Sequence, residues 1–281
     1  MKFLNNKMMN KLILCILCGI FFISVWKLFK IGQEYKMAQD SYEKIKTKVE
    51  KEQTEEALKL EQSDKTNIVE FPTYEEKTGS IQINGVSLKM LLGKKYEIDF
   101  ESLIELNKEV KAWIIIENTN INYPVVQASD NEKYLRQTLE GEWNNAGSIF
   151  IDCRNKQPFK EKNTIIHGHN QRNHMMFHDL VNYKEERYWK EHPYIQILMP
   201  NGESYLYYIY AYYITQEISE TYFVEFSSQQ QYKQYLDYIE QNNVYNTDIT
   251  IKNTDRIITL STCTNSWNEE RVVVHGVLIN S

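Results

Sequence analysis

The chain has 281 residues, of which 42% are hydrophobic and 13% aromatic, which is enough apolar material for one sizeable core and an appendage. Twenty Tyr beside only 10 Gly and 5 Pro argue against a disordered or low-complexity chain and favour β-structure. The formal net charge is −6, and leaving out the five Lys of the first 31 residues gives 27 basic against 38 acidic side chains, or −11. This excess of acid argues against a nucleic-acid partner.

Residues 1–31 predict a cytoplasmic tip and a membrane-spanning signal anchor. They contain no acidic residue, and the uncharged stretch LILCILCGIFFISVW lies between Lys11 and Lys27. Lys27 can snorkel, so residues 12–31 reach the length of about 20 residues that a span requires. A cleaved signal peptide is the alternative, but the expected small-residue cleavage site is missing after Val25. The Lys distribution places the N-terminus in the cytoplasm and the rest of the chain outside the cell.

Residues 32–80 are expected to form a charged helical stalk and linker. An apolar stripe, in which successive residues are three or four positions apart, stops before Glu52 and Glu56. It consists of Tyr35, Ala38, Tyr42, Ile45 and Val49. Because the stripe spans barely two heptads, a solvated helix that spaces the domain from the membrane is favoured over a stable coiled coil. The segment Thr78-Gly79-Ser80 marks the end of the linker, and a compact domain is expected over residues 81–281.

The compact domain is predicted to be rich in β-strands, with a few short helices. Asp99 can cap a helix that runs to about Glu109, and another helix is expected from Ser227 to Gln241. Strands are predicted at Trp113–Ile116, Tyr123–Val126, Ser148–Ile151, Thr164–His167, Tyr194–Leu198, Ser204–Ile214, Ile257–Thr262 and Val272–Ile279. Many strands with few crossover helices indicate a mainly β fold, a closed or nearly closed β-barrel.

A cysteine stands at the end of a strand in the segment RIITLSTCTNSWNEERVVVHG, residues 256–276. Because side chains alternate along a strand, Cys263 falls on the same face as Thr259 and Ser261. A hairpin between the flanking strands would bring Arg271 beside Cys263, where a guanidinium favours the thiolate and can stabilise an oxyanion. On spacing alone, a buried and inert thiol is the more common state of a free cysteine.

Four histidines lie at or just beyond the end of the strand TIIH: His167, His169, His174 and His178. His169 follows Gly168, which permits a sharp exit from the strand, and could be the acid–base partner that a cysteine nucleophile needs close in space. The cluster must also be considered as a zinc site. However, no Asp or Cys stands beside it at a recognisable ligand spacing, and the motif H-E-x-x-H is absent. No metal and no cofactor are therefore expected.

Together these segments resemble the sortases, and specifically the class B sortases. The resemblance is carried by TLSTC with an Arg eight positions after the Cys, by HGHN followed by MFHDL, and by the upstream runs INYPVVQASDNEKYL and GSIFIDCRN. It covers roughly residues 81–281. It implies a membrane-held cysteine transpeptidase on the outer face of a Gram-positive-type bacterium, built on the sortase β-barrel.

The same resemblance implies a role for each of three residues. Cys263 would attack the carbonyl of a Thr in the C-terminal sorting motif of a surface protein. Arg271 would hold that carbonyl or its oxyanion, and His169 would protonate the departing amine. An amine of a peptidoglycan precursor would then resolve the thioester and attach the surface protein to the cell wall.

Positions of the substrate groove are carried over from the resemblance as well: Asn131, Leu135, Ser261, Tyr222 and Phe223. Thr264, directly after the nucleophile position, stands where some relatives have an acidic residue.

Two other functions stay open at this point. One is a cysteine peptidase that passes the same acyl group to water, and the other is a membrane-tethered binding protein without chemistry.

Two further residues are given structural roles. Cys153 is the only other cysteine in the exported domain, so a disulfide framework is not supported. His275 is expected to be a strand histidine packed in or near the barrel.

Overall fold

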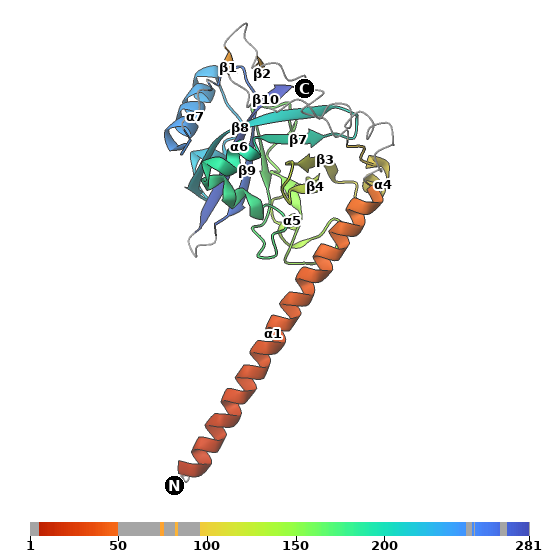
Figure 1. Ribbon diagram of the computed structural model, residues 1–281, viewed down its shortest axis with the longest axis vertical. Helices are drawn as coiled ribbons and strands as arrows, with labels where there is room; N and C mark the ends of the chain where they lie inside the picture. The colour runs from red at the N-terminus through yellow and green to blue at the C-terminus, as the bar shows by residue number, and fades with distance from the viewer. Residues whose placement is uncertain are drawn as a thin grey trace, which may run out of the picture.

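Eight strands close into a β-barrel in the computed structural model, which describes residues 6–49, 74–75, 82–83, 96–245, 249, 251–264 and 269–280 (Figure 1). In order around the barrel they are β10 (Glu270–Asn280), β8 (Ser204–Gln216), β7 (Tyr194–Leu198), β3 (Val110–Ile115), β4 (Asn122–Val126), β5 (Ile149–Ile151), β6 (Asn163–His167) and β9 (Ile257–Cys263). A separate antiparallel pair joins β1 (Tyr74–Glu75) to β2 (Gln82–Ile83). The predicted closed barrel is confirmed, and each expected strand lies within a few residues of its expected bounds.

Helices connect the strands and cover parts of the barrel. They are α1 (Asn6–Val49), α4 (Phe100–Leu106), α5 (Lys133–Arg136), α6 (Glu186–Glu191) and α7 (Gln229–Asn242), with 3₁₀ helices η1 (His178–Lys184) and η2 (Glu220–Tyr222). Asp99 caps α4 by accepting a hydrogen bond from the Ser102 amide, as predicted. The helix ends earlier than expected, because the backbone is already extended at Asn107 before β3 begins. The second expected helix is α7, capped by Ser228.

Two apolar layers follow from the alternation of side chains along the strands. On β10, Val272 and Val274 belong to the larger core, whereas Val273 and Val277 belong to a second layer that α7 covers. His275 lies in register with Thr259, bonds to its hydroxyl at 3.0 Å, and is fully buried. Burial lowers the pKa of His275 to about 3, so this histidine is a neutral packing residue, as the sequence predicted.

The apolar stripe of α1 packs against the barrel, which corrects the expectation of a solvated spacer. Four of its residues are buried, namely Ala38, Tyr42, Ile45 and Val49. The Tyr42 hydroxyl donates to the Gly147 carbonyl at 2.9 Å and lies 2.9 Å from the Ser148 hydroxyl. The stripe is too short for a coiled coil, but it is long enough to cover one patch of the barrel. Periodicity indicated an apolar face, but it could not indicate that the barrel covers this face, and the predicted solvated helix was wrong.

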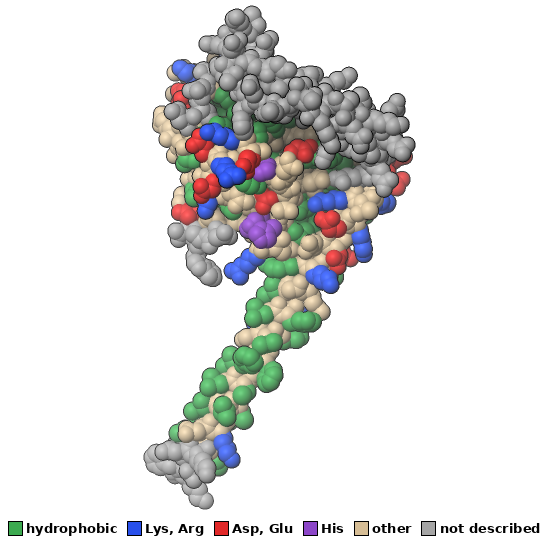
Figure 2. Space-filling view, in the orientation of Figure 1, with side chains coloured by type: hydrophobic (Ala, Val, Ile, Leu, Met, Phe, Trp, Pro, Cys, Tyr) green, Lys and Arg blue, Asp and Glu red, His purple; other side chains and the backbone are tan. Residues whose placement is uncertain are grey.

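The N-terminal part of α1 lies outside this contact and is apolar and exposed. Figure 2 shows hydrophobic side chains along this part of the helix, whereas charged side chains gather on the barrel. By length and composition the helix could cross a membrane, and none of its apolar window is buried. Along the described part of the helix, the first hydrogen bonds to the barrel are at Glu34, whose carboxylate and carbonyl accept from Asn145 and Asn144 respectively. The expected linker break at residues 78–80 and the boundary at residue 81 lie outside the described residues.

We expect Tyr42→Phe to lower the free energy of unfolding by about 1 kcal/mol, because the variant leaves the buried Gly147 carbonyl without its donor. Tyr35→Phe is the matched control on the same helix, since the described residues offer its hydroxyl no hydrogen bond, and we expect a change below about 0.5 kcal/mol. Denaturant unfolding of the full chain in detergent, followed by tryptophan fluorescence, measures both. Equal stability of the two variants would show that the Tyr42 hydroxyl does not contribute to the docking of α1.

Candidate active site

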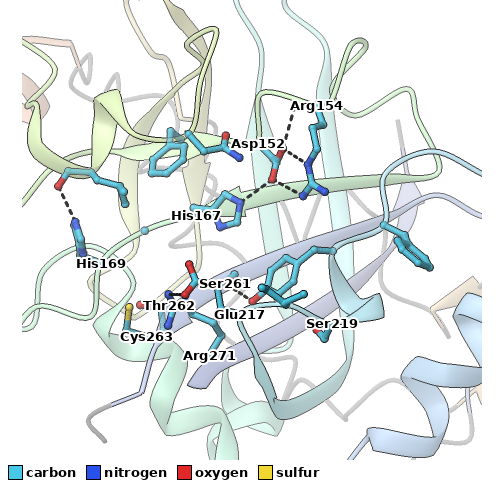
Figure 3. A pocket seen from close by; sticks show the side chains of 17 residues that line it. Asp152, Arg154, His167, His169, Glu217, Ser219, Ser261, Thr262, Cys263 and Arg271 are labelled. Carbon is cyan, nitrogen blue, oxygen red and sulfur yellow. Dashed lines mark hydrogen bonds and ion pairs between the residues drawn. The ribbon is translucent and has the colours of Figure 1, made fainter. Parts of the chain in front are cut away.

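Three strand ends meet at one rim of the barrel. β6 and β9 run parallel, with His167 opposite Ser261, so their carboxyl ends lie at the same edge. β9 and β10 run antiparallel, with Cys263 directly opposite Arg271, which confirms the predicted hairpin register. His169, two residues beyond β6, therefore lies at the same rim as Cys263 and Arg271 (Figure 3).

The residues on either side of His169 are bonded to the end of β9. The Gly168 amide donates to the Ser261 carbonyl at 3.1 Å, and the Asn170 side chain donates to the Cys263 carbonyl at 3.0 Å. A side chain at Gly168 would place its Cβ 2.8 Å from the ring of Phe177. Glycine is therefore needed here for close packing, and the packing holds His169 next to the strand that carries Cys263.

The imidazole of His169 is held by a backbone carbonyl. Its Nε2 lies 2.9 Å from the Leu135 oxygen. A carbonyl only accepts, so Nε2 carries the proton and Nδ1 is the basic nitrogen. Burial lowers the pKa of His169, and the charges of Arg136 and Arg271 lower it further, against the opposing effect of the Leu135 bond. A neutral imidazole can take a proton from a thiol during attack and return it later.

A tight backbone contact lies behind this histidine. Gly147 has a φ of +60°, and an added Cβ would lie 2.5 Å from the Tyr134 carbonyl and 3.1 Å from Cδ2 of His169. The carbonyl of Gly147 is the acceptor of the Tyr42 hydroxyl of α1. The N-terminal helix thus supports the loop against which the imidazole rests.

Arg271 has an ionic partner that the sequence did not reveal. Its Nη2 lies 3.0 Å from Oε2 of Glu217, and the two side chains are 22% and 55% exposed. Glu217 follows β8 directly, and β8 pairs with β10 so that Thr215 lies opposite Arg271. The only signal for this ion pair is the β8–β10 register, which joins segments more than 50 residues apart in the chain and cannot be read locally.

A pocket of about 500 Å³ opens at this rim. It is lined by Cys263, His169 and Arg271, and by all five positions expected to contact substrate: Asn131, Leu135, Ser261, Tyr222 and Phe223. Sequence reasoning missed several further lining residues as site residues, namely Asp152, Arg154, His167, Glu217, Ile218 and Ser219. The expected site residues therefore share one cavity, and their individual roles stay predictions.

The five expected substrate positions offer different surfaces. Leu135 and Phe223 are 39% and 42% exposed and present apolar contact area. The Tyr222 hydroxyl lies 2.9 Å from the Ser261 hydroxyl, and burial raises the pKa of Tyr222 to about 12, so the phenol stays neutral. Asn131 accepts a hydrogen bond from the Cys153 amide at 2.8 Å, which fixes its side chain at the wall.

A charged cluster closes one side of the pocket. Asp152 is buried and accepts two hydrogen bonds of 2.8 Å from the Arg154 guanidinium, and it lies 3.1 Å from Nε2 of His167. Burial alone would raise the pKa of Asp152, but the bonds from Arg154 and His167 lower it well below its usual range. The carboxylate stays ionised, and the half-exposed guanidinium of Arg154 offers donors to the cavity.

The four histidines at and after the end of β6 do not form one cluster. His167 and His169 line the pocket, whereas the rings of His174 and His178 lie against each other with centroids 4.3 Å apart. Asp179 lies beside this second pair. The expectation that no Asp stands near the cluster at a ligand spacing is therefore wrong, because His178 and Asp179, at the start of η1, lie beside His174 in space. All four cysteines of the chain are free.

Comparison with known proteins places this architecture among characterised relatives. Residues 114–279 match the family described as Sortase domain. Sortase B of Staphylococcus aureus is 35% identical over 197 residues, which cover 68% of this chain and 80% of that protein. Sortase B of Listeria monocytogenes is 36% identical over 190 residues, which cover 64% of this chain and 74% of that protein.

Solved structures show the same similarity. Clostridium perfringens sortase B superposes with a TM-score of 0.61 at 30% identity, covering 64% of this chain and 100% of that chain. A Staphylococcus aureus sortase B–substrate complex superposes with a TM-score of 0.64 at 28% identity, covering 88% of this chain and 99% of that chain.

We expect Glu217→Gln to increase the rate at which iodoacetamide alkylates Cys263 near neutral pH. The substitution leaves the Arg271 charge unbalanced beside the thiol, which favours the thiolate. The gain should be about twofold to fivefold, the range for a partly exposed ion pair, and should shrink at high salt. Glu220→Gln, which removes a nearby acid that is not paired with Arg271, is the control. Unchanged or slower alkylation in Glu217→Gln would contradict this interpretation of the ion pair.

Proposed function

Because this chain belongs to the sortase family and is a cysteine transpeptidase of class B, we propose that it attaches surface proteins to the cell wall. It would cleave a C-terminal sorting motif after a Thr and transfer the protein to an amine of a peptidoglycan precursor. The observation that carries the proposal is the meeting of Cys263, His169 and Arg271 in one pocket at the end of the parallel β6–β9 pair.

The proposed first half-reaction forms a thioester. Sγ of Cys263 attacks the Thr carbonyl carbon, and the basic Nδ1 of His169 takes the thiol proton. Arg271 donates to the oxygen that gains negative charge. When the carbon–nitrogen bond breaks, the imidazolium returns its proton to the leaving amine, and the acyl group stays on sulfur.

The proposed second half-reaction runs the same steps with a new amine. The acceptor amine attacks the thioester carbonyl and loses a proton to Nδ1 of His169, and the oxyanion is again held by Arg271. The carbon–sulfur bond then breaks and Cys263 recovers its proton. The products are a new amide and the free enzyme, so no cofactor is consumed.

The sorting peptide is proposed to lie in the cavity between Leu135 and Phe223. These two residues give apolar contact, whereas Ser261 and Tyr222 offer hydroxyl groups beside Cys263. Asn131 also lines this cavity. Displacement of Glu217 from Arg271 by the incoming Thr carbonyl would complete the site.

Membrane anchoring is the second part of the proposal. Residues 12–31 of α1 would span the membrane, with the N-terminus in the cytoplasm and the catalytic domain outside. The division of the chain is proposed as an anchor over residues 1–31, a stalk and linker over residues 32–80 and a catalytic domain over residues 81–281. Residues 34–49 of the stalk are docked on the catalytic domain.

The decisive experiment incubates the full chain in detergent with a small library of sorting peptides, with and without an amine acceptor. Mass spectrometry should detect a thioester on Cys263 and, with acceptor, a ligated peptide. Cys263→Ala should give neither, with an unchanged melting profile, while Cys153→Ser should retain both. Hydrolysed peptide alone in the presence of acceptor would indicate a peptidase. Full turnover by Cys263→Ala would overturn the assignment.

The roles of Arg271 and His169 can be separated by the leaving group. Arg271→Lys keeps the charge but loses the planar fork of donors, so turnover should fall about 100- to 1000-fold with the fold intact. His169→Ala should be at least as damaging on an amide peptide and clearly less so on an activated ester, whose leaving group needs no proton. Matched amide and ester substrates provide the assay. Near-full activity of Arg271→Lys, or equal impairment of His169→Ala on both substrates, would disprove this division of roles.

A further inference from the structure

Three side chains with metal-binding chemistry lie together outside the catalytic pocket. They are His174, in the loop after His169, and His178 and Asp179, at the start of η1. One ligand atom from each lies within 4.8 Å of the other two. Since zinc–ligand bonds are about 2.1 Å long, atoms this close need only a small side-chain movement to share one ion. His174 is exposed, so its side chain is free to make that movement.

The carboxylate of Asp179 lacks a strong cationic partner. The residue is 6% exposed, and its Oδ2 accepts hydrogen bonds from the amide and the side chain of Asn120, at 2.7 and 3.0 Å. Among the described residues, no Lys or Arg nitrogen lies within 4.0 Å of it. Because a buried carboxylate with only neutral donors is costly, a cation beside His174 and His178 would stabilise it.

His178 is oriented as metal-binding histidines usually are. Its Nδ1 lies 2.8 Å from Oδ1 of Asn170. An amide oxygen only accepts, so Nδ1 carries the proton of this bond, and Nε2 is the ring nitrogen that we assign to the metal. The ring of His178 also hydrogen-bonds to the backbone of Gln171. A hydrogen bond from the second ring nitrogen to a fixed acceptor sets the tautomer and raises the basicity of the ligand.

We propose that His174, His178 and Asp179 bind a divalent transition-metal ion of the zinc type, with water completing the coordination. Two imidazole nitrogens and one carboxylate oxygen suit Zn²⁺ better than Ca²⁺ or Mg²⁺, which take oxygen ligands. The site is separate from the proposed reaction, because neither histidine nor Asp179 lines the catalytic pocket.

The position of this site gives the bound ion a structural effect on the catalytic rim. Asn170 accepts from His178 through Oδ1 and donates to the Cys263 carbonyl through Nδ2, at 2.8 and 3.0 Å. A metal on Nε2 keeps the proton of His178 on Nδ1 and so fixes the orientation of the Asn170 amide. The ion therefore stabilises the segment 170–179 and its bond to the end of β9.

The test uses the full chain in detergent with the Cys263→Ala substitution, which removes a thiol that could compete for the metal. Titration calorimetry with Zn²⁺ should show one equivalent bound. Co²⁺ should give visible absorption without a thiolate charge-transfer band.

His174→Asn should weaken binding by at least about tenfold, and Asn tolerates the φ of 63° at this position. His192→Asn, which removes a histidine elsewhere, should bind normally.

Thermal unfolding provides a second readout of the same site. Zn²⁺ should raise the melting temperature of the parent and of His192→Asn, and should leave that of His174→Asn unchanged. Absence of zinc binding by the folded parent would overturn the proposal. Binding that survives His174→Asn but is lost in His169→Ala would also overturn it, because the ion would then occupy the catalytic pocket.

Discussion

The parallel pairing of β6 with β9 is the contact on which the candidate active site depends. It joins His167 to Ser261 across more than 90 residues of chain and places the two carboxyl ends at one rim. β9 is then held on its other side by β10, which sets Arg271 opposite Cys263. Backbone hydrogen bonds of a closed barrel thus position Cys263, Arg271 and the end of the strand that precedes His169, which leaves little freedom for their relative displacement.

Local patterns account for the part of the fold that could be predicted. Apolar runs bounded by polar turns gave the strands, and the antiparallel hairpin placed Arg271 beside Cys263. The β6–β9 pair has no local signal, so the proximity of His169 to Cys263 came only from the family resemblance. Glu217 depends in the same way on the β8–β10 register, which is why the ion pair with Arg271 was missed.

Two predictions, for the apolar stripe of α1 and for the histidine cluster, were wrong for another reason. Spacing along the chain does not identify a partner in space. The stripe ending at Val49 was recognised, but its partner is the surface of the barrel, where Tyr42 reaches the loop behind His169. The histidines were recognised too, but their spacing did not show that His174 lies beside His178 and Asp179 at the start of η1.

The docking of α1 limits where the enzyme can act. The helix is continuous from the apolar segment to the contact at Glu34, which lies three residues, or about 4.5 Å of helical rise, beyond Ile31. With α1 in the membrane as proposed, the barrel cannot drift or turn like a body on a flexible tether. The distance of its pocket from the membrane surface is therefore nearly fixed. For the proposed substrate, the height of its scissile bond above the bilayer is then a second condition for cleavage, beside the motif that it carries.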